Sequence, residues 1–261
     1  NREAATQLFN ASIGLGQTNA AYGWEARTAA FRGQVHASHD LFRRGLQLAV
    51  QGGFNEVASQ LALSDAEIHA TVNQCTDATQ EATEGLGLGR DNFALERASR
   101  IYALCGQPAL AATLVKELTS RYPQATLTLR IAVPMTEGAS ALSRGDYAQA
   151  LKILAGLRIY DRAPKSEYWI QYLRGLTHLR LKNGAEAVAD FRSILDHRGE
   201  NPNSSLYSLA RLGLARATLL TGDTALARRA YADFLETWKD ADEDLELLAQ
   251  ARAELARLSG T

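Results

Sequence analysis

The stretch GDYAQAL at residues 145–151 and the stretch GDTALAR at residues 222–228 decide how this chain folds. Each begins with Gly-Asp, a pair typical of a tight turn, and each has an alanine five residues after the glycine, Ala150 or Ala227. The same frame fits turns near residues 33, 73, 106 and 182, where in the last case the turn glycine has moved to Gly184. Because the six turns are 33 to 40 residues apart, the sequence predicts a chain of repeated structural units.

Two columns of small residues accompany the six turns, one seven residues before each turn and one five residues after it. Their members are Ala26, Ala66, Ser99, Gly138, Gly175 and Ala215, and Ser38, Ala78, Ala111, Ala150, Ala187 and Ala227. Small side chains let two helices cross closely, and a larger side chain four residues after the second column, such as Leu154 or Phe191, would fill the adjoining gap. The columns therefore predict tightly packed pairs of helices.

Apolar residues between the turns follow helical spacing. Leu151, Leu154 and Leu157 recur at the three-to-four-residue interval of one helix face and do not alternate as in a strand. All five prolines lie at or after residue 108, near breaks between segments, except Pro134, which fits only a first helical turn. We expect an all-α protein. Helices are predicted over 2–15, 19–31, 34–51, 54–71, 74–86, 91–104, 108–121, 130–143, 147–158, 167–181, 184–197, 204–220, 224–238 and 244–258.

The composition excludes several classes of protein. The chain has 261 residues, 46% hydrophobic and 22% charged, which is enough to bury a core. Its 28 Lys and Arg against 29 Asp and Glu leave a net charge of −1, without the basic surplus of proteins that bind nucleic acid or anionic lipid. No stretch approaches the ~20 apolar residues of a membrane span. We expect neither nucleic acid nor a membrane as a partner.

The cysteines and the chain start suggest where the protein works. Cys75 and Cys105 form no CxxC motif and are too few for a disulfide framework, so we expect buried reduced thiols. The first five residues lack the pattern of a signal peptide, which favours the cytoplasm. The sole methionine is Met135, so we expect a piece of a longer protein.

The repeating unit resembles the tetratricopeptide repeat (TPR). Units 130–162 and 206–239 match best, with small residues at both crossings and Gly-Asp at the turn, whereas Gly45 and Gly85 stand where the family usually has larger residues. The resemblance implies a right-handed α-solenoid of about six helix pairs plus a C-terminal capping helix, as one domain over residues 1–261. The repeats are expected at 19–50, 59–90, 91–123, 130–162, 167–199 and 206–239, and the cap at 244–258.

A narrower resemblance concerns the second half of the chain. The stretches YLRGL at 172–176, AVADFRSILDH at 187–197 and AYADFLETWKDAD at 230–242 are similar to C-terminal TPR regions attached to some bacterial serine/threonine protein kinases and winged-helix regulators. No DFG motif or kinase catalytic loop is present. The resemblance implies the interaction arm of a signalling protein.

The TPR resemblance also implies where a partner would bind. In that family the first helix of each pair lines a concave groove. Counting back from each turn gives the groove candidates Arg27, Glu67, Glu96, Arg100, Trp169, Tyr172, Arg180, Leu212 and Arg216. Aromatic and arginine side chains would suit a peptide with an apolar anchor and an acidic group, but Trp169 and Tyr172 could instead pack between repeats.

Two further clusters contain residue types that can bind a metal. His36 and His39 have a spacing from which two imidazoles could share a metal, but no third ligand is visible, so we predict no metal site. The acidic residues around 240–244 lack the pattern of a calcium loop and are expected to be a solvated loop before the cap. Residues 131–229 carry a basic excess and 230–261 an acidic one, either as attracting surfaces or as ordinary solvated faces.

The sequence therefore predicts a non-catalytic scaffold without cofactor. Its concave face would bind a protein or peptide, or other domains of the parent chain. The alternative is the ligand- or peptide-sensing arm of a transcription regulator, and a further one is a helical-superhelix enzyme. These alternatives differ in whether a small ligand raises the melting temperature or a cleft acid is needed for activity.

Overall fold

The structure is a computed structural model that describes residues 18–259, and in this part of the chain it is all α-helical, with no strand. The predicted helix over 2–15 lies outside the described residues. The helices are α2 (Thr18–Phe31), α3 (Val35–Gln51), α4 (Asn55–Thr71), α5 (Cys75–Leu88), α6 (Asn92–Leu104), α7 (Pro108–Arg121), α8 (Val133–Ser143), α9 (Tyr147–Gly156), α10 (Trp169–Arg180), α11 (Gly184–Leu195), α12 (Ser205–Leu220), α13 (Thr224–Thr237) and α14 (Glu246–Ser259). Each predicted helix from 19 onward is present.

The six predicted turns share one backbone conformation. Residues 33, 73, 106, 145, 182 and 222 all have positive φ, between 59° and 83°. Four are glycine, which adopts this conformation without steric cost, and Asn73 and Lys182 adopt it despite a side chain. The interpretation that the fifth turn moved to Gly184 is wrong, because Lys182 occupies the turn and Gly184 begins α11, where an added Cβ would lie 2.8 Å from Leu220.

The small residues pack as their spacing predicts. A Cβ added at Gly138 would lie 2.8 Å from Leu154, and one added at Gly175 would lie 2.8 Å from Phe191. The alanines and serines of both columns are fully buried. Gly85, which departs from the TPR pattern, allows Leu63 of α4 to approach in the same way, since its Cβ would lie 2.7 Å from Leu63. Helix pairing is thus set by small residues facing large ones.

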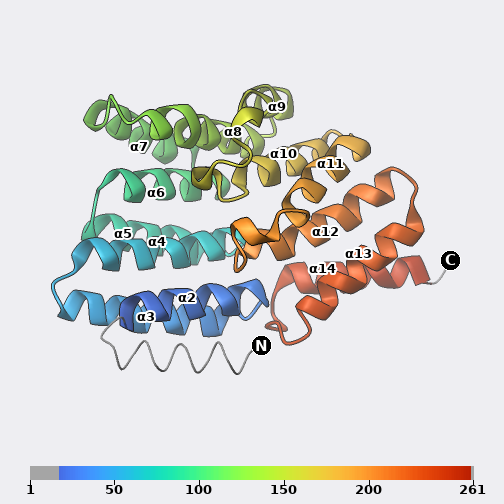
Figure 1. The fold of residues 1–261 in the computed structure, drawn as a ribbon, viewed down its shortest axis with the longest axis horizontal. Helices are drawn as coiled ribbons and strands as arrows, with labels where there is room; N and C mark the ends of the chain where they lie inside the picture. Colours follow the sequence, from blue (N-terminus) through green and yellow to red (C-terminus); the bar gives the residue numbers. More distant parts are fainter. Residues whose placement is uncertain (1–17, 260–261) are drawn as a thin grey trace.

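Consecutive helices pack as antiparallel pairs and build an α-solenoid. The first helices of the pairs, α2, α4, α6, α8, α10 and α12, also contact one another in order and form one layer. The chain then curls back, so that α12 contacts α2 and α4. Figure 1 shows this return, with the red C-terminal helices beside the blue first ones. The layer of first helices therefore closes on itself.

Contacts between the ends of the chain close this arrangement. Ser208 donates a hydrogen bond to the carbonyl of Phe31 (2.6 Å), and Tyr207 stacks on the Phe31 ring. Gly33 lies so close to Trp238 that an added Cβ would be 2.7 Å from its ring. Ser208 and Phe31 are 177 positions apart, so local sequence patterns could not reveal the closure.

The acidic segment before α14 is part of this closure. An Asp242 carboxylate oxygen accepts a hydrogen bond from the backbone N–H of His36 (2.9 Å), and the Asp242 N–H donates to the Gly33 carbonyl (3.1 Å). Asp242 thereby supplies the N-terminal acceptor that α3 lacks locally, since its own N-cap, Gln34, makes no such bond. The expectation of a merely solvated loop is wrong at Asp242, because a carboxylate is favoured at a helix N-terminus.

Replacing Asp242 by Ala should lower the free energy of unfolding by about 1 kcal/mol, the usual cost of losing a helix N-cap. Urea denaturation measures this cost, and hydrogen exchange should show faster exchange at the His36 amide. Asp240→Ala is the control, because Asp240 is exposed two residues away. Equal stability of the two variants would contradict the role of Asp242 as a cap.

The cysteine prediction is also wrong. Cys75, the first residue of α5, and Cys105, directly after α6, form a disulfide with their Cα atoms 5.3 Å apart. They meet because each lies at the turn inside its helix pair, and the turns of adjacent pairs lie along the same edge of the stack. Helical neighbours in sequence did not reveal this adjacency.

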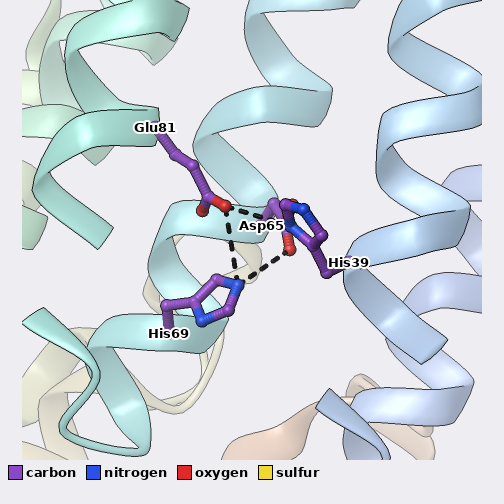
Figure 2. Close-up of side chains that lie close together, drawn as sticks. All are labelled: His39, Asp65, His69 and Glu81. Carbon is purple, nitrogen blue, oxygen red and sulfur yellow. Dashed lines mark hydrogen bonds and ion pairs between the residues drawn. The ribbon is translucent and has the colours of Figure 1, made fainter. Parts of the chain in front are cut away.

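The two histidines that share a helix face do not act together. His36 contacts Asp242 and Asp244 (3.5 and 3.3 Å), whereas His39 contacts Asp65 of α4 (2.7 Å; Figure 2).

None of the helices described over residues 18–259 has the length and apolar character needed to cross a membrane.

Short helical turns occupy the segments between the later helix pairs. A π-helical turn, Thr128–Ala132, precedes α8, and Pro134 stands in the first turn of that helix, as predicted. Short 3-10 turns, Arg158–Tyr160, Pro164–Ser166 and Arg198–Glu200, occupy the connections before α10 and α12. The segment 161–168 contributes side chains to the groove described next.

Candidate partner-binding groove

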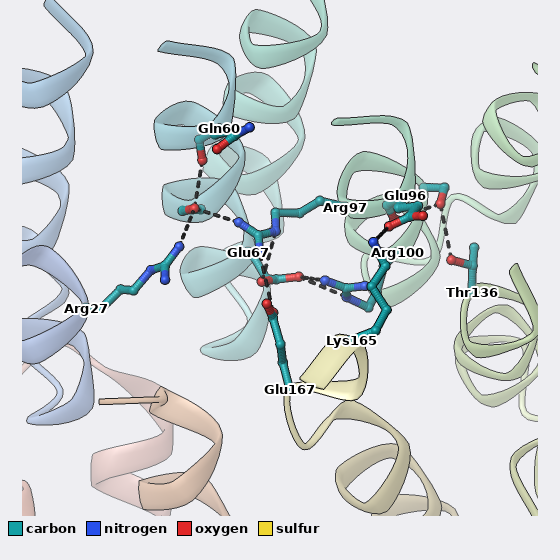
Figure 3. A network of polar contacts seen from close by, with 11 residues as sticks. Arg27, Gln60, Glu67, Glu96, Arg97, Arg100, Thr136, Lys165 and Glu167 are labelled. Atoms are coloured by element: carbon teal, nitrogen blue, oxygen red, sulfur yellow. Dashed lines mark hydrogen bonds and ion pairs between the residues drawn. The ribbon is translucent and has the colours of Figure 1, made fainter. Parts of the chain in front are cut away.

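A network of charged side chains lines the concave side of the first three helix pairs. Arg27 comes from α2, Glu67 from α4, and Arg97 and Arg100 from α6, while Glu167 comes from the segment before α10 (Figure 3). Helices α2, α4 and α6 all belong to the inner layer. Arg97 and Arg100 are three residues apart on α6 and therefore share a face of that helix. The sequence thus folds into a groove with charges of both signs.

Ion pairs hold most of the network in place. Arg100 Nε donates to Glu67 (2.9 Å), and Arg97 Nε lies 3.5 Å from the other oxygen of that carboxylate. Arg97 also donates to Ser64 Oγ (2.7 Å) and to Glu167 (3.4 Å). The guanidinium of Arg100 lies 4.9 Å from the centre of the Trp169 ring. Arg97 and Arg100 are therefore already partnered.

Lys165 and Glu167 complete the groove from the segment before α10. Lys165 forms an ion pair with the buried Glu96 and stands 4.2 Å from the centre of the exposed Phe93 ring. Burial favours the neutral form of Glu167, but Arg97, Arg100 and Arg27 outweigh it and hold the pKa of this carboxyl below its ordinary value. Glu167 is thus ionised at neutral pH.

Arg27 differs from the other cations of the groove. Its side chain is exposed, and among the described residues its hydrogen bond is to the neutral Ser64 Oγ (3.3 Å). It lines both cavities of the groove, one of about 480 Å³ and one of about 350 Å³. Arg27 can therefore offer its guanidinium to an anionic group from outside.

The structure brings together five of the nine predicted groove residues. Arg27, Glu67, Glu96, Arg100 and Trp169 line one or both cavities. Of these, Glu96, Arg100 and Trp169 are buried and Glu67 is half-buried, so their polar groups serve the protein's own network.

The other four candidates lie elsewhere. Tyr172 and Leu212 are buried, and burial raises the pKa of Tyr172 to about 12. Arg180 is exposed at the end of α10 and lines neither cavity. Arg216 donates to both oxygens of Glu254 on α14 (3.0 Å each), so the cap occupies it. Their assignment to a binding surface stays a prediction.

Sequence reasoning missed Arg97, Lys165 and Glu167. Arg97 lies one position after Glu96, and on a helix of 3.6 residues per turn both can border one groove. Lys165 and Glu167 lie outside the predicted groove helices and reach the groove only through the path of the segment 161–168 across it. The charge pattern of that segment, Asp-Arg-Ala-Pro-Lys-Ser-Glu, was the available clue.

Comparisons with known proteins add little. No protein-family profile matches the sequence, and no curated protein matches it. Among solved structures, the TPR domain of P58(IPK) is similar, at 13% identity and a TM-score of 0.41, over 100% of this chain and 89% of that one. The solenoid assignment rests on the helix packing described above, because a likeness of this size is too weak to support it.

Proposed function

We propose that this chain is a protein-interaction scaffold whose groove binds an extended peptide segment carrying an acidic side chain and an apolar anchor. The observation that carries the proposal is Arg27, an exposed cation at both cavities whose hydrogen bond is to a neutral hydroxyl. An arginine forms strong paired hydrogen bonds with a carboxylate. The exposed Phe93, which lines the smaller cavity, offers apolar contact area nearby.

The rest of the network supports the proposal by fixing the groove. Arg97 and Arg100 are held by Glu67 and Glu167, so the groove is formed before a peptide arrives. A preformed site binds more tightly because less conformational entropy is lost on binding.

A peptide selection tests the proposal. A random peptide library displayed on phage is selected against the folded chain, and enriched peptides are titrated by fluorescence anisotropy. We expect Asp or Glu near an apolar residue, and Arg27→Glu to weaken binding about tenfold or more, since a hydrogen bond to a charged group contributes about 1.5–3 kcal/mol.

Arg44→Glu is the matched control, because it makes the same charge change at an exposed position on α3 outside both cavities. Equal weakening by both variants would show a general charge effect, and no weakening by Arg27→Glu would refute the groove as the site. Circular dichroism confirms that both variants fold.

A second candidate function is the sensing of a small ligand. The larger cavity, about 480 Å³, has the size of small-molecule pockets and is bordered by Arg27, Glu67 and Trp169. A metabolite library screened by thermal shift distinguishes the two, because a sensor should gain several degrees with one compound and a peptide scaffold should not.

The biological setting follows from two further observations. The resemblance of residues 172–242 to kinase- and regulator-associated repeats leads us to infer the interaction arm of a bacterial signalling protein, with its partner either separate or elsewhere in the parent chain.

The Cys75–Cys105 disulfide favours an oxidising compartment over the cytoplasm, because thiols stay reduced in the cytosol. That the chain is not an enzyme remains a prediction.

A further inference from the structure

Four side chains with metal-binding atoms meet between three helices, away from the groove. His39 comes from α3, Asp65 and His69 from α4, and Glu81 from α5 (Figure 2). Asp65 and His69 are one helical turn apart and share a face. Because α4 packs against both α3 and α5, this face meets His39 on one side and Glu81 on the other.

The four side chains lie close enough to surround a single ion, which would move His39 Nδ1 and Asp65 Oδ2, now hydrogen-bonded, slightly apart. One ligand atom from each residue can be chosen so that all four lie within 4.8 Å of one another. His39 Nδ1 lies 2.7 Å from Asp65 and 3.1 Å from Glu81, and His69 Nε2 lies 3.6 and 3.5 Å from the same carboxylates. A tetrahedral zinc with bonds of about 2.0–2.2 Å holds its ligand atoms roughly 3.3–3.6 Å apart.

The hydrogen bond of His69 to Gln74 leaves a nitrogen lone pair of His69 facing carboxylate oxygens, with no proton between them. His69 Nδ1 contacts the Gln74 Oε1 atom (2.7 Å), which requires the proton on Nδ1 and a lone pair on Nε2 in the neutral imidazole. That lone pair faces Asp65 and Glu81, and three buried atoms, Asp65 Oδ1, His69 Nε2 and Glu81 Oε2, have no hydrogen-bond partner. A cation between Asp65 Oδ1 and His69 Nε2 would give both of these atoms a partner, and Glu81 would face it with Oε1, the oxygen that lies 3.5 Å from His69 Nε2.

Burial makes an empty cluster costly. The side chains of Asp65, His69 and Glu81 are 2%, 8% and 9% exposed. His39, 38% exposed, leaves a path from solvent to the cluster. Two buried carboxylates without a full set of donors call for a compensating charge.

We propose that His39, Asp65, His69 and Glu81 bind one divalent transition-metal ion, with Zn²⁺ as the ion that suits this ligand set. Two imidazoles with two carboxylates fit zinc, whereas calcium and magnesium prefer oxygen ligands alone. All four ligands come from the protein, as in structural zinc sites, and Gln74 orients one of them from outside. The ion would join α3, α4 and α5 and so tie the first repeat to the second.

A zinc titration of chelator-treated protein tests this proposal. We expect one Zn²⁺ per chain by calorimetry and mass spectrometry, and a rise in melting temperature when Zn²⁺ is added. Glu81→Gln is the informative variant, because it removes a ligand while relieving the buried charge. It should melt no lower than the metal-free wild type, yet bind Zn²⁺ about 100-fold more weakly or worse, given that losing even an outer partner costs 10–100-fold.

Two control variants test whether Zn²⁺ binds at a neighbouring position instead. Glu84→Gln changes a carboxylate one turn away on α5 that pairs with Arg43, and His36→Gln removes the exposed histidine beside Asp242 and Asp244. Both should bind Zn²⁺ as the wild type does. Loss of binding in His36→Gln would move the site to the protein surface and overturn the proposal.

Spectroscopy gives a second readout that does not depend on affinity. Co²⁺ in the site should show the strong visible absorption of tetrahedral coordination, and X-ray absorption of the zinc form should show two imidazole and two carboxylate ligands at about 2.0–2.2 Å. Octahedral, water-rich coordination, equal affinity of wild type and Glu81→Gln, or no binding at micromolar Zn²⁺ would each overturn the proposal.

Discussion

Replacing Arg174 by Leu should lower the free energy of unfolding by about 3–5 kcal/mol, the cost of leaving buried charges without their partner. Arg174 is 1% exposed and binds two carboxylates. It donates to both oxygens of Asp161 (2.9 and 2.8 Å) and to Asp190 (2.9 and 2.5 Å). Burial raises the pKa of Asp190 even with Arg174 present, so its loss removes the main support of that charge.

Chemical denaturation measures this effect, and Arg180→Leu is its control. Arg180 lies on the same helix but is exposed, and a surface change usually alters stability by less than about 0.5 kcal/mol. The double variant Arg174→Leu/Asp190→Leu should recover part of the loss, because one stranded carboxylate is removed. If Arg174→Leu were as stable as Arg180→Leu, the buried pair would not contribute as described.

Arg174 also connects stability to the groove. Asp161 begins the segment that carries Lys165 and Glu167 across the concave side, and it is anchored by both terminal guanidinium nitrogens of Arg174. We therefore expect Arg174→Leu to weaken the binding of a groove peptide as well, whereas Arg44→Leu, at an exposed position outside both cavities, should not.

Removing the Cys75–Cys105 disulfide should lower the free energy of unfolding by about 3–4 kcal/mol. The crosslink joins residues 30 positions apart, and the loop-closure entropy it removes from the unfolded chain predicts this size. Urea denaturation with and without a thiol reductant measures the loss, and Cys75→Ser/Cys105→Ser should reproduce it.

The double serine variant is also the control for the reductant. Its denaturation curve should not move when the reductant is added, because no disulfide is left to reduce. Alkylation of the unreduced, denatured wild type followed by mass spectrometry should label neither cysteine. Labelling of both cysteines there would show that the thiols are free and contradict the disulfide.

The sequence alone determined the helices, the turns and the tight crossings. The positions of the six turns and the contacts of Gly138 with Leu154 and of Gly175 with Phe191 were implied by residue spacing, whereas the positive φ at Lys182 was not. These features can be predicted because helix spacing and turn residues act within a few positions of the chain. The small residues at the crossings recur at a regular interval along the sequence, so they can be recognised as a repeat.

The tertiary structure alone decided the features that join distant residues. The curvature of the stack brings Asp242 to the start of α3, and the stacking of adjacent helix pairs brings Cys75 to Cys105. The path of the segment 161–168 places its side chains in the groove. The cluster of His39, Asp65, His69 and Glu81 spans three helices whose relative rotation follows from packing at Gly45, Gly85 and their neighbours. Small rotations between repeats add up along a solenoid, so the residues that meet across it depend on the whole stack and not on any one repeat.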